Sequence, residues 1–526
     1  MGATMRAALV VSLSVWASGA LAAQGLGEFD RALAAYQAGD VRNAIGPFFE
    51  LAEGASDPGL RAKSEFYLAQ SLQKAGLLVT ASTYHADVVR SGPGHPFYLE
   101  SVQALVELQR SLDDPYLVPS VLAKAYREQW GALADPSRSR LYYLVALMRH
   151  RARKLDEARQ LLLLVSKDSP VYAKSRYLLG VVVSDPRFPG GPRPDEALQA
   201  FQDALDQRPP AQEGLADVRQ LALLGKGRVH YGLGQYELAV KEYEQVPRFS
   251  KYWDQALFEL GFARFRAGDF GGALGALQAL HSPQFESAFQ PESWLVKATV
   301  YYFSCLYNEA ATAMKAFADI YNPMAEQMTA LMGRQGDDFD SYFRMLTDPN
   351  DTSLPRQVKL WVRGNQRILD LFELLGQIDK EKAQLATMGG PAAPVLEAYL
   401  DQNRQTVVQT AGKLVRARLE EASRNIHRFN QDGALIRFET TLATKRLLES
   451  GIDQNKLLAD QKLYRPRIPG DDWNYWQFQG EFWIDEIGYY QYTLKQGCPS
   501  PEAEPEEARE ERRPPQVPAG GAKEEP

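Results

Sequence analysis

The sequence has few of the residues from which catalytic and metal centres are usually built. Its 526 residues include two cysteines and six histidines. Cys305 and Cys498 are too far apart for a CxxC zinc motif, and the histidines show no HExxH or other ligand spacing. A phosphate-binding GxxxxGK followed by Ser or Thr and a GxSxG nucleophile turn are also missing. We therefore expect no metal, no cofactor and no catalytic activity.

Positive charge is also in deficit. The formal net charge is -7 at pH 7, and the isoelectric point is about 5.6. A nucleic-acid surface needs clustered Lys and Arg to replace the counterions along the phosphates. The composition therefore argues against a nucleic-acid partner.

Long hydrophobic runs are missing after the N-terminus, and the first 23 residues have the pattern of a cleaved secretory signal. Arg6 gives a positive start, AALVVSLSVWASG an apolar core, and Ala20 to Ala22 the small residues of a cleavage site. The run is short for a membrane span, no cysteine lies at the cleavage point, and no other segment has about 18 uninterrupted apolar residues. We predict export to the periplasm and a mature chain without a transmembrane segment or lipid anchor.

What the sequence does contain is a repeated pattern of glycine, alanine and aromatic residues. In GLGQYELAVKEYEQVPRF, Gly234 is followed by Tyr236, Ala239 and Tyr243. The residue equivalent to Ala239 recurs as Ala44, Ala81, Ala158, Ala197, Ala273 and Ala310. The single steps are 34 to 42 residues, a period typical of a helical solenoid. The interval from Ala81 to Ala158 is double and holds a degenerate pair of helices.

The spacing serves packing rather than catalysis. In each unit, a small residue such as Gly227 in the first helix lets the second helix approach closely, and a glycine such as Gly234 lets the chain turn. One unit cannot bury its own apolar face, so neighbouring units must stack. We predict an all-α array of about seven recognisable repeats and one degenerate repeat over residues 24–321.

These residues resemble the tetratricopeptide repeat family, most specifically from Asp195 to Phe317. The resemblance implies a right-handed superhelix of helix pairs with a concave groove, and scaffolding or peptide binding rather than catalysis. In the family's register, the following residues face the groove: Arg228, Tyr231, Phe262, Phe265, Arg266, Tyr302 and Phe303. Aromatic rings beside cations would suit an extended peptide or a carboxylate. The alternative is that the rings pack against adjacent first helices as core.

Residues 322–463 keep helical periodicity without the repeat pattern. TDPNDTSLP and MGGPAAP should end helices, and residues 395–463 read as one or two long helices. The apolar seam of this region is formed by Leu396, Leu400, Val407, Ala411, Leu414, Ala422, Ile426 and Phe429. We expect the seam to pack back on the last turn of the array, because arrays need capped ends, with pairing between chains as the alternative.

Residues 464–498 form an aromatic block, in which nine of the twenty residues from Trp473 to Tyr492 are aromatic. One interpretation is a small C-terminal cap over the array. The other is a docking surface for an envelope protein or a glycan, anchored by Trp476, Phe482 and Trp483. A hydrolytic acid pair at Glu481 and Asp485 has no supporting feature. Residues 499–526 have almost no apolar material and should be disordered.

The block FQGEFWIDEIGYYQYTLKQGC after an exported repeat array resembles periplasmic tetratricopeptide-repeat proteins of myxobacteria, including components of the adventurous gliding-motility machinery. That resemblance implies a scaffold that joins parts of an envelope complex. The alternative function is a peptidoglycan or glycan-binding accessory protein that uses the aromatic block. Cys305 and Cys498 either remain thiols or form a disulfide that ties the block to the last clear repeat.

Overall fold

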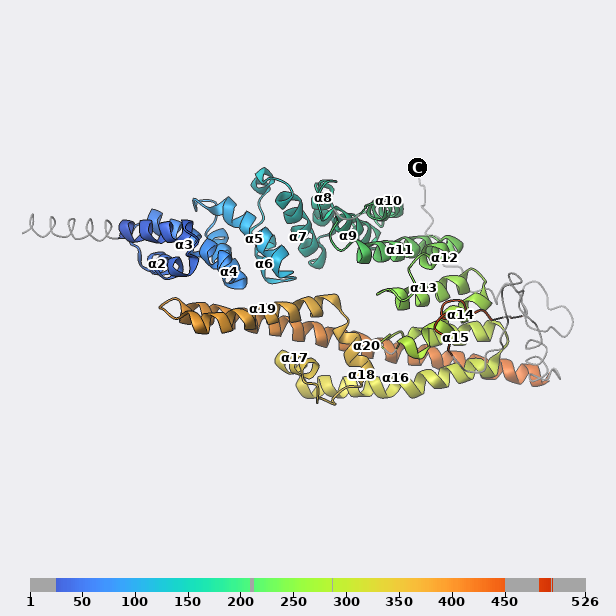
Figure 1. Ribbon diagram of the computed structural model, residues 1–526. Coiled ribbons are helices and arrows are strands. Elements are labelled where there is room, and N and C mark those ends of the chain that lie inside the picture. The colour runs from blue at the N-terminus through green and yellow to red at the C-terminus, as the bar shows by residue number, and fades with distance from the viewer. Residues whose placement is uncertain (1–24, 209–211, 286, 450–481, 493, 495–526) are drawn as a thin grey trace, which may run out of the picture. The chain divides into compact units, whose positions relative to one another are not determined.

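The computed structural model describes residues 25–208, 212–285, 287–449, 482–492 and 494. Every regular element in these ranges is a helix, and none of their residues lies in a strand. The helices of the array follow one another as consecutive pairs joined by short turns (Figure 1). The prediction of an all-α helical solenoid is confirmed. The predicted signal segment, 1–23, and the predicted disordered tail, 499–526, lie outside the described residues.

The chain divides into two compact units. Unit 1 contains the described residues up to 172 together with 339–343 and 365–414. Unit 2 contains residues 173–338, 344–364 and the described residues from 415 onward.

Unit 1 begins with the first four helix pairs of the array. Their helices are residues 25–37, α2 (Val41–Gly54), α3 (Pro58–Lys74), α4 (Leu78–Ser91), α5 (Tyr98–Leu112), α6 (Leu117–Ala125), α7 (Ser137–Arg151) and α8 (Leu155–Leu163), with the short 3-10 helix η1 (Glu128–Ala132) after α6. The start of α3 shows how local sequence sets a boundary. Pro58 occupies the first position, and the Asp57 carboxylate accepts the Leu60 amide at 2.6 Å.

Unit 2 continues the array with four more pairs. They are α9 (Tyr172–Ser184), α10 (Pro194–Leu205), α11 (Leu215–Gly232), α12 (Tyr236–Glu244), α13 (Trp253–Arg266), α14 (Phe270–Leu280), α15 (Glu292–Phe303) and α16 (Tyr307–Gln335), with η2 (Pro283–Phe285) after α14. The helix α16 runs past residue 321, so the boundary placed there by the repeat pattern falls inside a helix.

The remaining helices are α17 (Phe339–Thr347), α18 (Arg356–Arg363), α19 (Gln366–Met388) and α20 (Ala393–Glu449). The two segments expected to end helices do so, after Thr347 and after Met388. A further break at Gly364 and Asn365 separates α18 from α19. Residues 393–449 form one continuous helix, and residues 450–463 of the predicted long-helix region lie outside the described residues.

The repeated alanines lie where one helix of a pair crosses the other. Each occupies the second helix of its pair and is completely buried: Ala44, Ala81, Ala158, Ala197, Ala239, Ala273 and Ala310. The turns between paired helices need left-handed backbone at one position. Gly39, Gly76, Gly234 and Gly268 hold it with φ between 74° and 84°, and Cys305 holds it in the last pair with φ 57°.

Close approach explains the small residues of the first helices. A Cβ at Gly227 in α11 would lie 2.4 Å from the ring of Tyr243 in α12, and one at Gly261 in α13 would lie 3.0 Å from Leu277 in α14. Any larger residue at Gly227 would force the two helices apart. These contacts confirm the packing role inferred from the spacing.

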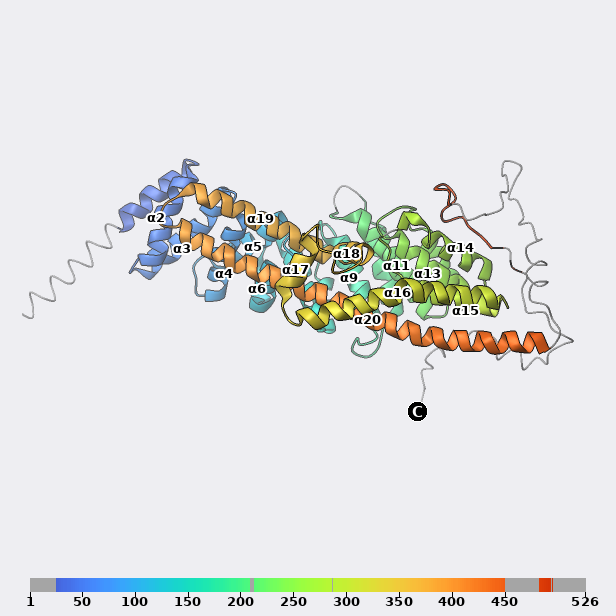
Figure 2. The same cartoon turned by 90° about the horizontal axis from the view of Figure 1, so that it is seen from below.

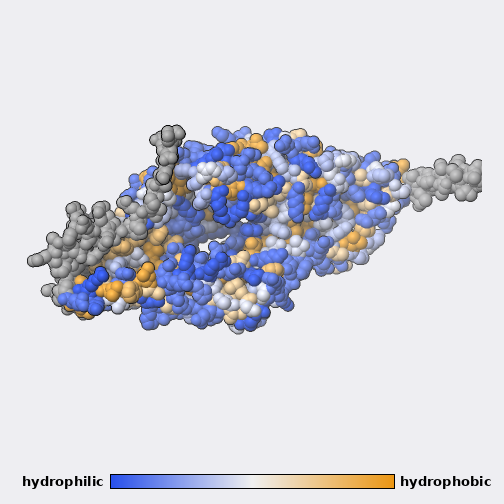
Figure 3. Space-filling view, turned by 180° about the vertical axis from the view of Figure 1, so that it is seen from behind, coloured by the Kyte–Doolittle hydropathy of each residue, from blue (hydrophilic) through white to orange (hydrophobic). Residues whose placement is uncertain are grey.

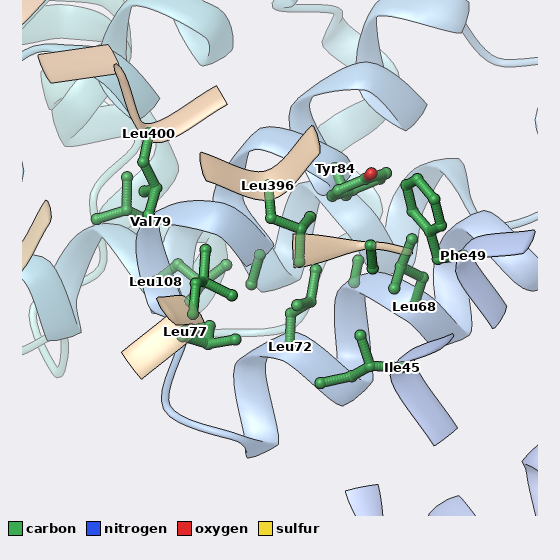
Figure 4. Close-up of a cluster of buried hydrophobic side chains, with 14 of the residues drawn as sticks. Ile45, Phe49, Leu68, Leu72, Leu77, Val79, Tyr84, Leu108, Leu396 and Leu400 are labelled. Carbon is green, nitrogen blue, oxygen red and sulfur yellow. The ribbon is translucent and has the colours of Figure 1, made fainter. Parts of the chain in front are cut away.

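The core of unit 1 joins the first repeats to the long helices α19 and α20. Leu396 and Leu400 of α20 are fully buried and reach into a cluster that includes Leu72, Leu108 and Val79 (Figure 4). Residues of α19 belong to the same cluster. Both views show α19 and the start of α20 side by side (Figures 1 and 2). The first half of the predicted seam therefore packs on the first repeats, not on the last turn of the array as expected.

A buried carboxylate fixes α19 to the start of α4. Glu381 is 2% exposed, and its two oxygens accept the amides of Val79 at 2.7 Å and Thr80 at 3.1 Å and the Thr80 hydroxyl at 2.9 Å. These amides are among the unpaired donors of a helix N-terminus, where the helix dipole also favours an anion. Burial raises the pKa of Glu381, and the hydrogen bonds from Val79 and Thr80 oppose that rise.

The second half of the seam packs inside unit 2. Ala422, Ile426 and Phe429 are buried, and the Ser423 hydroxyl lies 2.9 Å from that of Thr329 in α16. Because α16 is the second helix of the last pair, this half follows the expected packing on the end of the array. The seam therefore packs within the chain rather than between chains over the described part of α20.

Candidate peptide-docking surfaces

The aromatic residues predicted to face the groove pack against one another within unit 2. Tyr231 of α11 stacks on Phe262 of α13, with ring centroids 5.4 Å apart. Phe265 is 5% exposed and contacts Phe303 of α15 at 5.9 Å. Burial raises the pKa of Tyr231 to about 12. The structure thus brings these residues together as rings that bridge successive first helices, which is the packing that we set against the binding interpretation.

The two predicted cations are engaged by side chains of the chain itself. Arg228 makes a two-pronged ion pair with Glu259 of the next first helix, with Nη2 to Oε1 at 2.6 Å and Nε to Oε2 at 3.0 Å. Arg266 donates to the Tyr236 hydroxyl and lies over that ring at 4.9 Å. The Nε and Nη2 donors of Arg228 are therefore already used by Glu259.

A second surface of unit 2 is covered by a segment of the chain itself. Residues 482–492, from the aromatic block, lie against α13, α14 and α15 in unit 2, and both ribbon views place them beside α14 (Figures 1 and 2). Ile487 is the fully buried residue of this segment and belongs to a cluster with Trp253, Ala276 and Leu280. Burial of such a side chain stabilises the docked state by about 1.5–3 kcal/mol.

Arg248 binds the backbone of the docked segment. Its Nη2 donates to the carbonyl oxygens of Ile484, Asp485 and Ile487 at 3.2, 2.9 and 2.7 Å. Its guanidinium also lies 4.3 Å from the centre of the Tyr489 ring, a cation–π distance. Because these hydrogen bonds go to carbonyls, they impose no side-chain identity on residues 484 and 485.

Two glycines of α14 allow the backbone of the segment to lie directly on the helix. A Cβ at Gly271 would lie 2.1 Å from the Tyr492 carbonyl oxygen, and one at Gly275 would lie 1.7 Å from that of Tyr490. The Tyr492 amide donates to the Gly271 carbonyl at 3.1 Å. We call the residues that contact the segment here the α14 surface: Arg248, Trp253, Gly271, Gly275, Gln278 and Tyr301.

Tyr492 completes the contact. Its hydroxyl lies 3.5 Å from the Gln278 amide oxygen and hydrogen-bonds with Tyr301 of α15. Burial raises the pKa of Tyr492, and the hydrogen bond with Tyr301 opposes the rise. The segment is therefore held at three points along its length, by Arg248, by the Ile487 pocket and by the glycines with Tyr301.

The residues predicted to anchor an external partner are not the ones that hold the segment on the array. Trp483 is 59% exposed, and Phe482 is half-buried against the Tyr490 ring at 6.2 Å. Trp476 lies outside the described residues. The aromatic density drew attention away from Ile487, the apolar residue between an acidic pair and Gly488. The sequence signal for the α14 surface was the pair of glycines four residues apart inside a helix.

The proposed disulfide falls partly outside the described residues. Cys305 is 3% exposed in the turn between α15 and α16, and it is disulfide-bonded. Cys498 is the other cysteine of the sequence and lies outside the described residues. Their pairing stays a prediction.

A cavity of about 400 Å³ lies elsewhere in unit 2, between the end of α14, the start of α15, α16 and α18. His281 stacks on Trp294 at 4.1 Å, and its Nε2 lies 2.8 Å from the Ser293 hydroxyl. Ser293 donates to the Gln290 carbonyl, so the imidazole must donate through Nε2. Burial lowers the pKa of His281, with Lys297 adding to the effect, so the ring is neutral.

The described residues also bear on membrane and metal binding. No helix among the described residues is long and apolar enough to cross a bilayer, and no three His, Cys, Asp or Glu side chains gather there to hold a metal ion. Figure 3 shows hydrophobic residues in separate patches among hydrophilic ones on the visible face. Exposed apolar residues include Leu435, Phe438 and Leu448 of α20.

Comparison with known proteins gives structural neighbours without a family. No protein-family model and no curated protein matches the sequence. The chain is similar to a Rap protein in complex with competence and sporulation factor, at 12% identity and a TM-score of 0.28, over 67% of this chain and 99% of that one. It is similar to yeast Tom70 at 10% identity and a TM-score of 0.21, over 73% and 95% of the two chains. The fold assignment rests on the helix pairs described above, because such scores add nothing to it.

Proposed function

We propose that the protein is an exported, non-catalytic scaffold that binds other proteins of the cell envelope through its helical array. The observation that carries the proposal is the docked segment 482–492. Residues 484–488 of this segment form a turn, and the array holds the segment by its backbone and by one buried side chain. Recognition of a peptide segment in this way needs no catalytic group.

Location in the periplasm is part of the proposal and is supported by the sequence pattern of residues 1–23. A role in gliding-motility machinery is its narrowest form and is supported by the resemblance of residues 478–498 alone. Fractionation of the native cells, with the mature N-terminus determined by mass spectrometry, tests the location. A chain that keeps residues 1–23 and stays in the cytoplasm would contradict it.

Crosslinking followed by affinity capture from the native envelope tests the scaffold. Wild type is compared with Arg228→Ala, which breaks the ion pair to Glu259 between two first helices, and with Gly275→Ala, which blocks the α14 surface. Specific partners lost in one variant identify the surface that binds them. Circular dichroism must show that each variant keeps its helices. If no partner is captured by any form, the scaffold proposal fails.

A glycan-binding accessory role is the second candidate, and the exposure of Trp483 favours it. Indole rings in water-exposed positions stack on the apolar faces of sugars. Sedimentation with purified cell wall is the test, with Trp483→Ala and Trp476→Ala as variants. Cosedimentation that both substitutions abolish would favour this role over the scaffold.

A further inference from the structure

The contacts at the α14 surface constrain only a few residues of the docked segment. The pocket beside Trp253 takes one aliphatic side chain, that of Ile487. A Cβ at Gly488, which has φ +96°, would lie 2.8 Å from the Trp253 ring, so the next residue is restricted to glycine. The surface therefore selects a segment that turns over residues 484–488 and carries an aliphatic residue, then glycine, then a tyrosine in the position of Tyr492.

The resident segment covers this surface without being built into the fold. Residues 482–492 contain no helix, and the side chains of Trp483, Ile484 and Tyr489 are 59, 63 and 62% exposed. Segments with few buried side chains and solvent-exposed hydrogen bonds are those that open locally without global unfolding. Residues 450–481 connect the segment to the end of α20, and the predicted bond between Cys305 and Cys498 would tie its other end to the turn after α15, so in the open state it remains a tethered ligand.

We propose that the α14 surface is a docking site for a turn-forming segment of a partner protein, and that residues 482–492 close it in cis. The partner segment carries an aliphatic residue followed by glycine and, four residues after the glycine, by tyrosine. This inference rests on the proposed scaffold function and names how one of its surfaces is regulated. A tethered ligand competes at an effective concentration of about 1 mM, so a partner binds well only when it outcompetes the segment or when the segment is displaced.

The test uses the full chain and a fluorescent peptide of residues 482–494. The peptide ends before Cys498 and so forms no disulfide. Ile487→Asp in the chain opens the surface, because a carboxylate cannot be buried unpaired in the apolar pocket. In the double variant Ile487→Asp/Gly275→Ala, the first substitution releases the resident segment and the second blocks the surface with a new Cβ. Ile487→Asp with Gly333→Ala is the matched control, because a Cβ at Gly333 meets nothing within 4 Å.

We expect the peptide to bind Ile487→Asp and the Gly333→Ala control equally. Wild type should bind roughly tenfold more weakly or worse, because its own segment competes. The Gly275→Ala double variant should not bind, and neither should a peptide carrying aspartate in place of its isoleucine. Equal binding by wild type and Ile487→Asp would overturn closure in cis. Binding by the Gly275→Ala double variant would overturn the α14 surface as the site.

The test is separable from that of the scaffold function. If the peptide binds as expected and Ile487→Asp captures no envelope protein, the surface is real and the scaffold proposal fails. If folded Ile487→Asp does not bind the peptide, the docking site is overturned while capture through the first-helix face remains open to test. Urea unfolding of each variant confirms that it is folded before binding is measured.

Discussion

Replacing Gly275 by alanine should release the docked segment while strengthening the helix beneath it. The new Cβ would lie 1.7 Å from the Tyr490 carbonyl oxygen and 2.5 Å from its carbonyl carbon. Real Cβ atoms essentially never approach another heavy atom closer than 3.0 Å, so the segment must withdraw by about 1 Å or more. Such a shift breaks the hydrogen bond from the Tyr492 amide to Gly271, which depends on the same close approach.

The two effects of this substitution have opposite signs. In a helix interior, alanine is more favourable than glycine by about 0.8–1.0 kcal/mol. The docked segment loses the burial of Ile487, about 1.5–3 kcal/mol, and hydrogen bonds through Arg248 and Tyr492 of about 1 kcal/mol each. Docking occurs only on the folded array, so its loss also lowers the free energy of unfolding, by about 1.4 kcal/mol for a closing equilibrium of about tenfold. The gain in helix propensity offsets most of this loss, so the free energy of unfolding of unit 2 should fall by about 0.5 kcal/mol.

Native-state hydrogen exchange, together with urea unfolding, measures both effects. In wild type, the Tyr492 amide should be protected, whereas in Gly275→Ala it should exchange at close to the rate of an unstructured peptide. Gly333→Ala in α16 is the control: it should stabilise its helix and leave Tyr492 protected. Undiminished protection of Tyr492 in Gly275→Ala would refute the close approach on which the α14 surface is built.

Three further predictions concern other parts of the chain. Glu381→Ala should lower the free energy of unfolding of unit 1 by about 2–4 kcal/mol, because it leaves buried amides of α4 unpaired, and Glu381→Gln should cost less; urea unfolding compares them. Burial lowers the pKa of His85 to about 4, so protons bind the unfolded chain first, and up to about 3 kcal/mol of stability should be lost as the pH falls from about 6.5 to 4. His85→Asn, which can keep the hydrogen bond to Ser101, should remove that part of the pH dependence; an unchanged profile would contradict this assignment. Labelling of the denatured, unreduced protein should find no reactive thiol, whereas two labelled thiols would rule out a bond between Cys305 and Cys498.

The array could be predicted because its determinants are local. Ala239 and Gly234 lie within one pair of helices, and their spacing reflects a crossing and a turn that the same short stretch of chain forms. The position held by Gly234 is filled by Cys305 in the last pair. The repeat was still recognised there because Ala310 and the neighbouring aromatic residues kept the period.

The packing of the long helices could not be predicted because it depends on partners hundreds of residues away. The apolar seam correctly marked the buried face of α20, and Leu396 and Leu400 are fully buried. A seam specifies which face is buried and not what covers it. The decisive contact, Glu381 on the first amides of α4, joins residues about 300 apart and leaves no periodic signal.

The contact between the aromatic block and the array could not be predicted for a related reason. Trp483 is mostly exposed and stays a predicted anchor for an external partner, whereas Ile487 is the side chain that the array buries. What selects Ile487 is the pocket beside Trp253, together with Gly488, which is the residue that fits against the indole ring. A pocket formed by α13 and α14 is not visible in the sequence of residues 482–492.

The glycines of α14 carry the strongest link between sequence and function. Gly275 lowers the helix propensity of α14 by about 0.8–1.0 kcal/mol relative to alanine, and neither Gly271 nor Gly275 has the left-handed backbone that would require glycine. Gly261 in α13 faces a side chain of its own pair, whereas these two glycines face the backbone of residues 490–492. The helix stability lost by having glycine here is explained only when a backbone lies on that face of the helix. The chain's own segment supplies it in cis, and a partner segment of the same pattern would supply it when the resident segment leaves.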